Sequence, residues 1–356
     1  MLKAKFIVFG KEISISVEII AKTYVINLCN LLLFKVDNVI KKLKNQLPSN
    51  QMNTMVSSMD QFQVLLQEQR QFRPFGVLLS KFDFEGKEMQ VYKISEGNEA
   101  FNKYLARVQT LALWYIEGAE YTDNDDSRWN HYFVYEAIKR PDDIGYRYIL
   151  AGYSSVVNFY CHPFMVRTRI AQFLVLPQYR GKGNGSRFLQ SIYNDLISRK
   201  EVKDVTVEDP SDKFMFMRDF IDCRNCAQLI EFSADNLKKG FSIEMKEAAQ
   251  KKLKINPRQA RRVYEILRLM KTDVRNEQEL KDYRIDVKRR LEQPFKKSER
   301  DWNRLKRALN DEEMATVIAN QTNIEKKIDT LRKLYDSLIL DYKIVIDRLK
   351  IFTDLS

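Results

Sequence analysis

The sequence is poor in the residues that build metal and redox sites. It has four cysteines and two histidines among 356 residues. Cys29 and Cys161 stand alone, and Cys223 and Cys226 form a CxxC pair without a second CxxC or HxxxH to complete a zinc site. The pair also lacks the βαβ surroundings of a thioredoxin-like motif. We therefore expect no metal, and reduced cysteines indicate an intracellular protein.

Long apolar runs are also missing. The stretch TYVINLCNLLLFKV at 23–36 is too short and too interrupted to span a bilayer. The start of the chain has no small-residue cleavage site typical of a signal peptide. We therefore expect a soluble protein with no membrane contact.

Composition and periodicity divide the chain into three parts. Residues 1–85 mix short strand-like runs with polar linkers, which predicts an N-terminal α+β domain. Residues 86–255 read as helix, three strands, glycine loop, helix and strand, which predicts a mixed sheet with helices packed against it. Residues 256–356 have no glycine and show long helical periodicity, which predicts a C-terminal helical domain. The predicted fold class is α+β.

The scarce glycine gathers in one loop. The segment RGKGNG at 180–185 has three alternate glycines between the apolar strand RTRIAQFLVL and the helix SRFLQSIYNDLI. Glycine lets the backbone approach a ligand and take positive φ, and the amides of a helix N-terminus attract anions. Arg180 and Lys182 add full positive charges. The sequence therefore predicts a phosphate-binding loop.

The spacing of this loop selects among phosphate-binding families. It does not fit a P-loop, and Ser186 stands where a dinucleotide fingerprint needs its third glycine. Residues 178–183, QYRGKG, match the [Q/R]xxGx[G/A] signature of the acetyltransferase superfamily, in which the loop holds the pyrophosphate of acetyl-coenzyme A. A plain glycine-rich turn between a strand and a helix would give the same pattern.

Several further segments, in the same order, closely resemble the catalytic subunits of type B histone acetyltransferases. The strongest, within about 105–305, are TLALWYIEGAEYTDNDDSRWNHYFVYE, RTRIAQFLVLPQYRGKG, KDVTVEDPSDKFMFMRDF, INPRQARRVYEILRL and YRIDVKRRLEQPFKKSERD. Weaker similarity reaches FGKEISISVEI and FRPFGVLL, and the chain begins later than typical members. The resemblance implies a GNAT-like core that transfers acetyl from acetyl-coenzyme A to the ε-amine of lysine in newly made histones.

This reaction needs a base, because a lysine ammonium, with a pKa of roughly 10.4, has no lone pair. By resemblance, Glu208 matches the general base of the family, with Asp209 beside it. We expect the two on opposite faces of a strand, with Glu208 near a buried apolar face. The same run fits a helix N-cap at Asp209 or Ser211. No cysteine lies in these motifs, so we expect direct attack in a ternary complex.

The resemblance also locates the coenzyme. Phe173, Leu174 and Val175 match the strand whose backbone pairs with the pantetheine arm, although their side chains would equally be sheet core. The N–H of Val175 is a candidate donor to the oxyanion. The pyrophosphate loop matches Arg180, Gly181, Lys182, Gly183, Asn184, Gly185 and Ser186. Phe220, with Arg218 near it, matches a position beside the coenzyme.

The acceptor is a basic tail, so a chain of net charge +12 needs local acid to bind it. The acidic residues cluster at Glu117, Glu120, Asp123, Asp125 and Asp126. By resemblance, Glu117 and Trp129 match positions that contact the histone peptide. From the residues alone, a solvated acidic loop explains the cluster. Val157 departs from the family, which often has a tyrosine there.

The excess of lysine and arginine over acidic residues fits either an anionic partner or a lysine-rich solvated surface. The basic segment 287–307 is a candidate for nucleic-acid contact or nuclear import, or is a charged helical face, with too few aromatics for a base-stacking platform. The resemblance implies a WD-repeat histone chaperone as partner, and nuclear and cytoplasmic localisation. Two alternatives stay open: an acetyltransferase for another amine, and a non-catalytic histone- or nucleic-acid-binding module.

Overall fold

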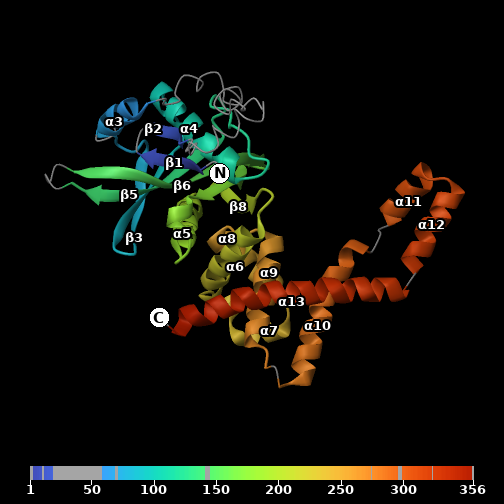
Figure 1. Ribbon diagram of the computed structural model, residues 1–356. Helices are drawn as coiled ribbons and strands as arrows, with labels where there is room; N and C mark the ends of the chain where they lie inside the picture. Colours follow the sequence, from blue (N-terminus) through green and yellow to red (C-terminus); the bar gives the residue numbers. More distant parts are fainter. Residues whose placement is uncertain are drawn as a thin grey trace, which may run out of the picture. The chain divides into compact units, whose positions relative to one another are not determined.

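The computed structural model describes residues 3–9, 12–18, 58–68, 71–140, 145–273, 275–295, 299–322 and 324–354. The chain separates into two compact units (Figure 1). Unit 1 is Met1–Glu201 with Thr206–Glu208, and unit 2 is Val202–Val205 with Asp209–Ser356. The predicted boundaries at 85 and 255 stay predictions. Cys29 and the apolar stretch 23–36 lie outside the described residues.

Unit 1 is built on a six-stranded sheet with the order β3-β4-β5-β6-β7-β8. Its strands are β3 (Val77–Phe84), β4 (Lys87–Ile94), β5 (Trp129–Lys139), β6 (Tyr146–Cys161), β7 (Met165–Val175) and β8 (Val202–Val207), the last shared with unit 2. Strands β3 to β7 are antiparallel. Strand β8 runs parallel to β7, because backbone bonds join Val166 to Glu201 and Ile170 to Glu208. The predicted mixed sheet and the α+β class are confirmed.

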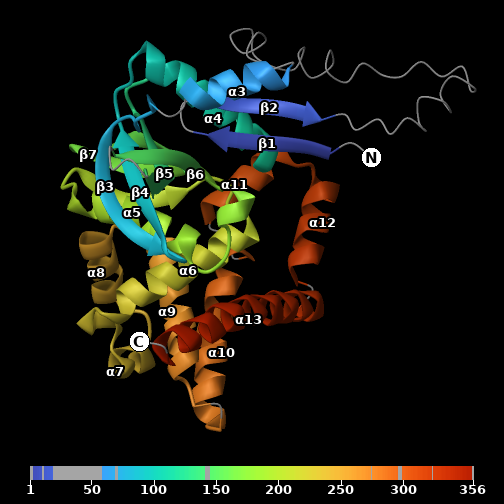
Figure 2. The ribbon, with the colours of Figure 1, turned by 60° about the vertical axis from the view of Figure 1, so that its left-hand side comes forward.

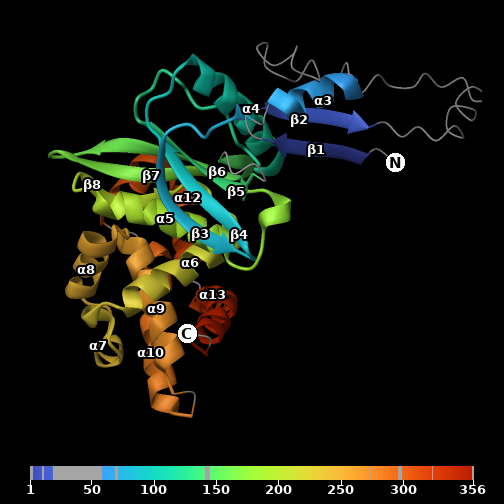
Figure 3. The same cartoon turned by 90° about the vertical axis from the view of Figure 1, so that its left-hand side faces the viewer.

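A helix covers each face of this sheet (Figure 3). The helices are α4 (Glu99–Tyr115) and α5 (Asn184–Ser198). Tyr132 donates a hydrogen bond of 2.6 Å to Asp195 of α5. The next residue, Phe133, points to the opposite face and packs against Tyr104 of α4, with ring centroids 5.7 Å apart. Because side chains alternate along β5, this strand contributes to the packing on both faces of the sheet.

An antiparallel pair of strands precedes this sheet in the chain. Figure 2 shows β1 (Lys3–Phe9) and β2 (Glu12–Glu18) side by side, with α3 (Met59–Glu68) beside them. The pair agrees with the short strand-like runs expected in residues 1–85.

Unit 2 is helical apart from the first residues of β8. Its helices are α6 (Asp212–Ala227), α7 (Ala234–Lys239), α8 (Ile243–Leu253), α9 (Pro257–Lys271), α10 (Glu277–Glu292), α11 (Glu299–Ala308), α12 (Asp311–Thr322) and α13 (Ile324–Asp354). Asn256 caps α9 by accepting a 3.1 Å bond from the Gln259 N–H, as the Asn-Pro signal predicts. Within the described ranges, no helix combines the length and apolarity needed to cross a bilayer.

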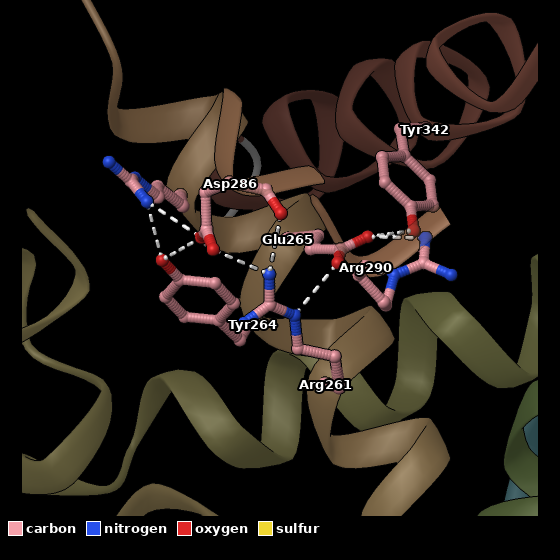
Figure 4. Close-up of polar contacts among 7 residues, drawn as sticks. Arg261, Tyr264, Glu265, Asp286, Arg290 and Tyr342 are labelled. Atoms are coloured by element: carbon pink, nitrogen blue, oxygen red, sulfur yellow. Dashed lines mark hydrogen bonds and ion pairs between the residues drawn. The ribbon is translucent and has the colours of Figure 1, made fainter. Parts of the chain in front are cut away.

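A buried ionic network ties α13 to α9 and α10 (Figure 4). The fully buried Glu265 accepts bonds of 2.6–2.8 Å from Arg261, Arg290 and Tyr342. Arg261 also donates to Asp286 at 2.8 Å. Burial is the largest single influence and raises the pKa of Asp286, but the hydrogen bonds and charges of Arg261, Tyr264 and Arg268 together outweigh it, so the pKa of this carboxyl is lowered. Every carboxylate of the network is thus paired, which a buried charge requires.

Candidate active site

Glu208 lies where β8 stops pairing with β7. Its N–H donates to the carbonyl of Ile170 at 3.0 Å, and β8 itself ends at Val207. Strand β7 continues through Ala171–Val175 beyond this bond. The register of β7 against β6 shifts at the same level, between the pairs of Ser155 and Val156, which marks a bulge. The backbone of Glu208 therefore lies at the point from which β7 continues past β8.

The predicted oxyanion donor faces this edge of β7. The N–H of Leu176 donates to Ala151 of β6 at 2.9 Å. Because backbone N–H groups alternate along a strand, the N–H of Val175 points away from β6, toward the side of β8. The carbonyl of Val175 points the same way and accepts a 2.8 Å bond from Nε of Arg180. The end of β7 and the glycine loop are thus joined at this edge.

Strand β6 passes close to β7 at a glycine. A Cβ added to Gly152 would lie 2.6 Å from the carbonyl oxygen of Leu174 and 3.5 Å from Cα of Val175. Neither backbone atom can yield without moving β7. Gly152 therefore fixes the path of the strand predicted to line the pantetheine arm.

The glycine loop has the geometry of an anion site. Gly181, Lys182 and Gly183 all have positive φ, of 83°, 44° and 84°. Gly183 is the N-cap of α5, and no side chain caps the helix there. A Cβ at either glycine would meet nothing within 4 Å, so the loop presents open backbone. These features fit a ligand phosphate held by backbone amides and the helix dipole.

The other predicted loop residues support this shape. Asn184 is fully buried and donates to the carbonyl of Tyr179 at 3.0 Å, while its Oδ1 is buried without a hydrogen-bond partner in the described structure. Lys182 forms an ion pair with Glu85. Gly185 and Ser186 open α5. Phe173 packs on Phe188 of α5, with centroids 5.1 Å apart, and Leu174 is buried.

Glu208 itself differs from the expectation in two ways. It follows the strand instead of lying on it, and its side chain is 49% exposed instead of facing a buried apolar surface. Its Oε1 lies 3.5 Å from Nη1 of Arg169 on β7. The chain turns at Asp209, which has a φ of 31°. The strand alternation expected for this pair therefore does not apply.

The remaining predicted residues of this region belong to unit 2. Asp209 does not cap α6, because Ser211 is the N-cap and its Oγ accepts the Phe214 N–H at 3.4 Å. Phe220 is buried in α6, and its ring lies 5.9 Å from that of Phe352 in α13. Arg218 is also buried and donates to the carbonyl of Val205 at 3.1 Å.

The paired cysteines lie on the same helix. Cys223 and Cys226 are buried in α6, and burial raises the pKa of both thiols. Such thiols are poor nucleophiles and metal ligands in this state. Within the described ranges, no three His, Cys, Asp or Glu side chains gather as a metal site.

Hydrogen bonds from α4 and β7 anchor the acidic segment 117–126. Gln109 of α4 donates to Thr122 at 2.6 Å and to the hydroxyl of Tyr153 at 3.1 Å. Gln172 of β7 donates to the backbone carbonyl of Glu120 at 2.7 Å. Glu117 is exposed at the end of α4. The segment is thus fixed to α4 and β7. Its residues Glu117, Glu120, Asp123 and Asp125 are exposed, whereas Asp126 is paired with Arg128 at 2.7 Å.

Trp129 begins β5 at the other end of this segment. Its ring stacks on His131, with centroids 6.5 Å apart and an interplanar angle of 10°. His131 contacts the Tyr153 hydroxyl at 3.1 Å, so Trp129 rests on the same buried network. Both predicted peptide-contact residues therefore lie on unit 1, at the two ends of one anchored acidic segment.

Sequence reasoning missed three residues of this site. An isolated glycine inside a strand indicates a close backbone approach, so Gly152 carried a readable signal. Gln172 and Arg169 carried none, because their partners Glu120 and Glu208 are set by tertiary structure.

Comparisons with known families agree on the kind of protein. Residues 18–117 match the family described as "Histone acetyl transferase HAT1 N-terminus". Residues 218–269 match "Histone acetyltransferase type B catalytic subunit, C-terminal".

Individual relatives point the same way. The "Histone acetyltransferase type B catalytic subunit" of Rattus norvegicus is 35% identical over 319 residues, which cover 88% of this chain and 74% of the relative. The Homo sapiens protein gives the same identity and coverage. A solved structure, "Structure of xEco2 acetyltransferase domain bound to K105-CoA conjugate", covers 42% of this chain and 93% of that chain, at 10% identity and a TM-score of 0.31. That score is too low to carry an argument.

Proposed function

The chain belongs to the family of type B histone acetyltransferase catalytic subunits, and we propose that Glu208 is the general base of its reaction. The observation that carries the proposal is the arrangement at the end of β8. Glu208 is bonded to Ile170 there, beside the stretch of β7 in which the Val175 N–H faces the same edge. A base and an oxyanion donor on one edge are what acyl transfer to an amine requires.

The proposed acyl donor is acetyl-coenzyme A, which supplies an activated acetyl group. The open amides of Gly181 and Gly183, the uncapped start of α5 and the charge of Lys182 fit its phosphates. The backbone of Phe173–Val175 would pair with its pantetheine arm. Phe220 and Arg218 are proposed neighbours of the coenzyme on the strength of the resemblance.

The proposed acceptor is a lysine of a newly made histone tail. Glu208 takes the proton that the lysine ammonium must lose, and the amine then attacks the thioester carbonyl directly. The C–N bond forms first, and the Val175 N–H donates to the oxygen that gains charge. The C–S bond then breaks, and the proton lost by the attacking nitrogen leaves with the coenzyme as its thiol. The reaction passes through a ternary complex, with no acetyl-enzyme. Asp209 is proposed as a supporting carboxylate.

The basic tail would lie on the acidic segment, with Glu117 and Trp129 in contact with it. Opposite charge speeds encounter, and the buried anchors of the segment limit the entropy lost on binding. We further propose a WD-repeat histone chaperone as partner, and activity in nucleus and cytoplasm. Co-purification of a tagged chain with such a chaperone, and imaging of the tagged chain in cells, test these two proposals.

The decisive experiment measures transfer of labelled acetyl from acetyl-coenzyme A to a histone tail peptide and to its lysine-free version. Glu208→Gln should lower kcat at least about 100-fold while coenzyme affinity is unchanged. Glu201→Gln is the matched control, because Glu201 is a 50% exposed, arginine-paired glutamate at the opposite end of β8. Equal activity of Glu208→Gln and Glu201→Gln would show that Glu208 is not the base. Transfer only to other amines would favour a different acceptor.

A further inference from the structure

Arg169 is placed to act on the proposed base. It lies on β7, opposite Val157 of β6, and its Nη1 lies 3.5 Å from Oε1 of Glu208. The carbonyl of the next residue, Ile170, accepts the Glu208 N–H at 3.0 Å. Two consecutive residues of β7 therefore hold Glu208, one through its backbone and one through its side chain.

The guanidinium of Arg169 is itself held in place. Its Cζ lies 4.7 Å from the ring centroid of Phe159 on β6. A planar guanidinium over an aromatic face loses orientational freedom, and a compact ammonium would be held less firmly. The side chains of Arg169 and Glu208 are 39% and 49% exposed. Exposed ion pairs add little to stability, so the position of Arg169 beside the proposed base needs another explanation.

The chemistry of the acceptor supplies one. A lone carboxylate attracts lysine as the ammonium, which cannot attack, so it would stabilise the unreactive ground state. A fixed positive charge beside the carboxylate offsets this attraction and favours the neutral amine. We propose that Arg169 is a positioning residue that orients Glu208 and weakens its hold on the protonated acceptor lysine. This inference rests on the proposed role of Glu208.

The other charges near Glu208 define the controls. Arg167 lies two residues earlier on the same face of β7, opposite Phe159 in the register, and Asp209 follows Glu208 in the chain. In the described part of the chain, Glu208 forms its ion pair with Arg169. Arg167→Gln therefore removes the same charge from the same face without touching the pair.

The test compares the pH dependence of acetyl transfer to a tail peptide for the full-length wild type, Arg169→Gln, Arg169→Lys and Arg167→Gln. In Arg169→Gln we expect kcat to fall about tenfold at pH 7.5 and KM for the peptide to fall severalfold. The rise of kcat with pH should move up by about one pH unit, so that the deficit in kcat relative to wild type shrinks above pH 9. Arg169→Lys should keep the pH dependence of wild type with a lower kcat, and Arg167→Gln should resemble wild type.

The outcomes separate this inference from the proposed function. A uniform loss at every pH in Arg169→Gln, or a rise in KM, would make the residue merely structural and overturn the inference. Phe159→Leu is a second test that keeps the charge, and it should give a smaller change in the same direction. If Glu208→Gln is inactive while Arg169→Gln keeps the pH dependence of wild type, only the inference about Arg169 fails. If Glu208→Gln is fully active, the proposed base fails first.

Discussion

Gly152 and Gly183 are glycines for different physical reasons. At Gly152 the limit is space, since a Cβ would lie 2.6 Å from a backbone oxygen. At Gly183 the space is open and the limit is conformational, because its φ of 84° is unfavourable for any residue with a Cβ. The first glycine shapes the path of β7, and the second shapes the turn whose amides begin α5.

We expect Gly183→Ala to weaken binding of coenzyme A about tenfold, because strain in the turn moves the amides that would bind the phosphates. Titration calorimetry with coenzyme A measures this affinity. Gly118→Ala is the control, since Gly118 has a φ of 71°, equally open surroundings and no predicted coenzyme contact. Both variants should lose about 1 kcal/mol of stability. Equal coenzyme affinity in the two would contradict a special role for the loop.

At the scale of elements, the start of α5 differs from the starts of α6 and α9. Ser211 and Asn256 cap α6 and α9 with their side chains. Gly183 has no side chain to do so, and α5 begins uncapped. A ligand phosphate would supply the missing acceptors, so the feature that leaves the helix uncapped is the one that the predicted anion site would use.

Helix α13 depends on the ionic network seen in Figure 4. We expect Glu265→Ala to lower the free energy of unfolding by about 3 kcal/mol, because Arg290 would lose its carboxylate partner and Arg261 would keep only Asp286. The buried Tyr342 hydroxyl would also lose its acceptor. Glu247→Ala on α8 removes an exposed pair with Lys251 and should change stability by less than about 0.5 kcal/mol. Urea denaturation followed by circular dichroism compares them. Similar losses would mean that the network is not important for stability.

At the scale of the whole molecule, one buried group in each unit links stability to pH, and the two links have opposite signs. Burial lowers the pKa of His131 in unit 1 to about 4, so the folded state resists protonation that the unfolded state accepts below about 6.5. In unit 2, burial raises the pKa of Asp222 to about 7, so the folded state holds a proton that the unfolded state releases. Acidification therefore destabilises unit 1 through His131, and rising pH destabilises unit 2 through Asp222.

We expect wild type to lose up to about 3 kcal/mol of stability through His131 as the pH falls from 6.5 to 4, a loss that His131→Gln should remove. Denaturation curves across this range measure it. The difference between the two proteins isolates His131, because Asp222 acts equally in both. His162→Gln, at the exposed turn between β6 and β7, should behave as wild type. A parallel pH dependence in wild type and His131→Gln would refute the assignment.

The sequence by itself determined the local features of this protein. The strand, glycine loop and helix around 167–198, the Asn-Pro start of α9 and the α+β order follow from backbone preference and hydrophobic period, which act between near neighbours. The family followed from ordered motifs. The end of the strand before Glu208 was not predicted, although Asp209 and Pro210 just after it are residues that disfavour strands.

Only the tertiary structure decided which distant residues meet. The pair of Arg169 with Glu208 depends on β8 returning parallel to β7 after α5. The bond from Tyr342 to Glu265 depends on how α13 crosses α9, and that of Gln172 to Glu120 on where the acidic segment lies. Register and packing angle set these contacts through the sum of many weak interactions, and no local pattern in the sequence encodes them.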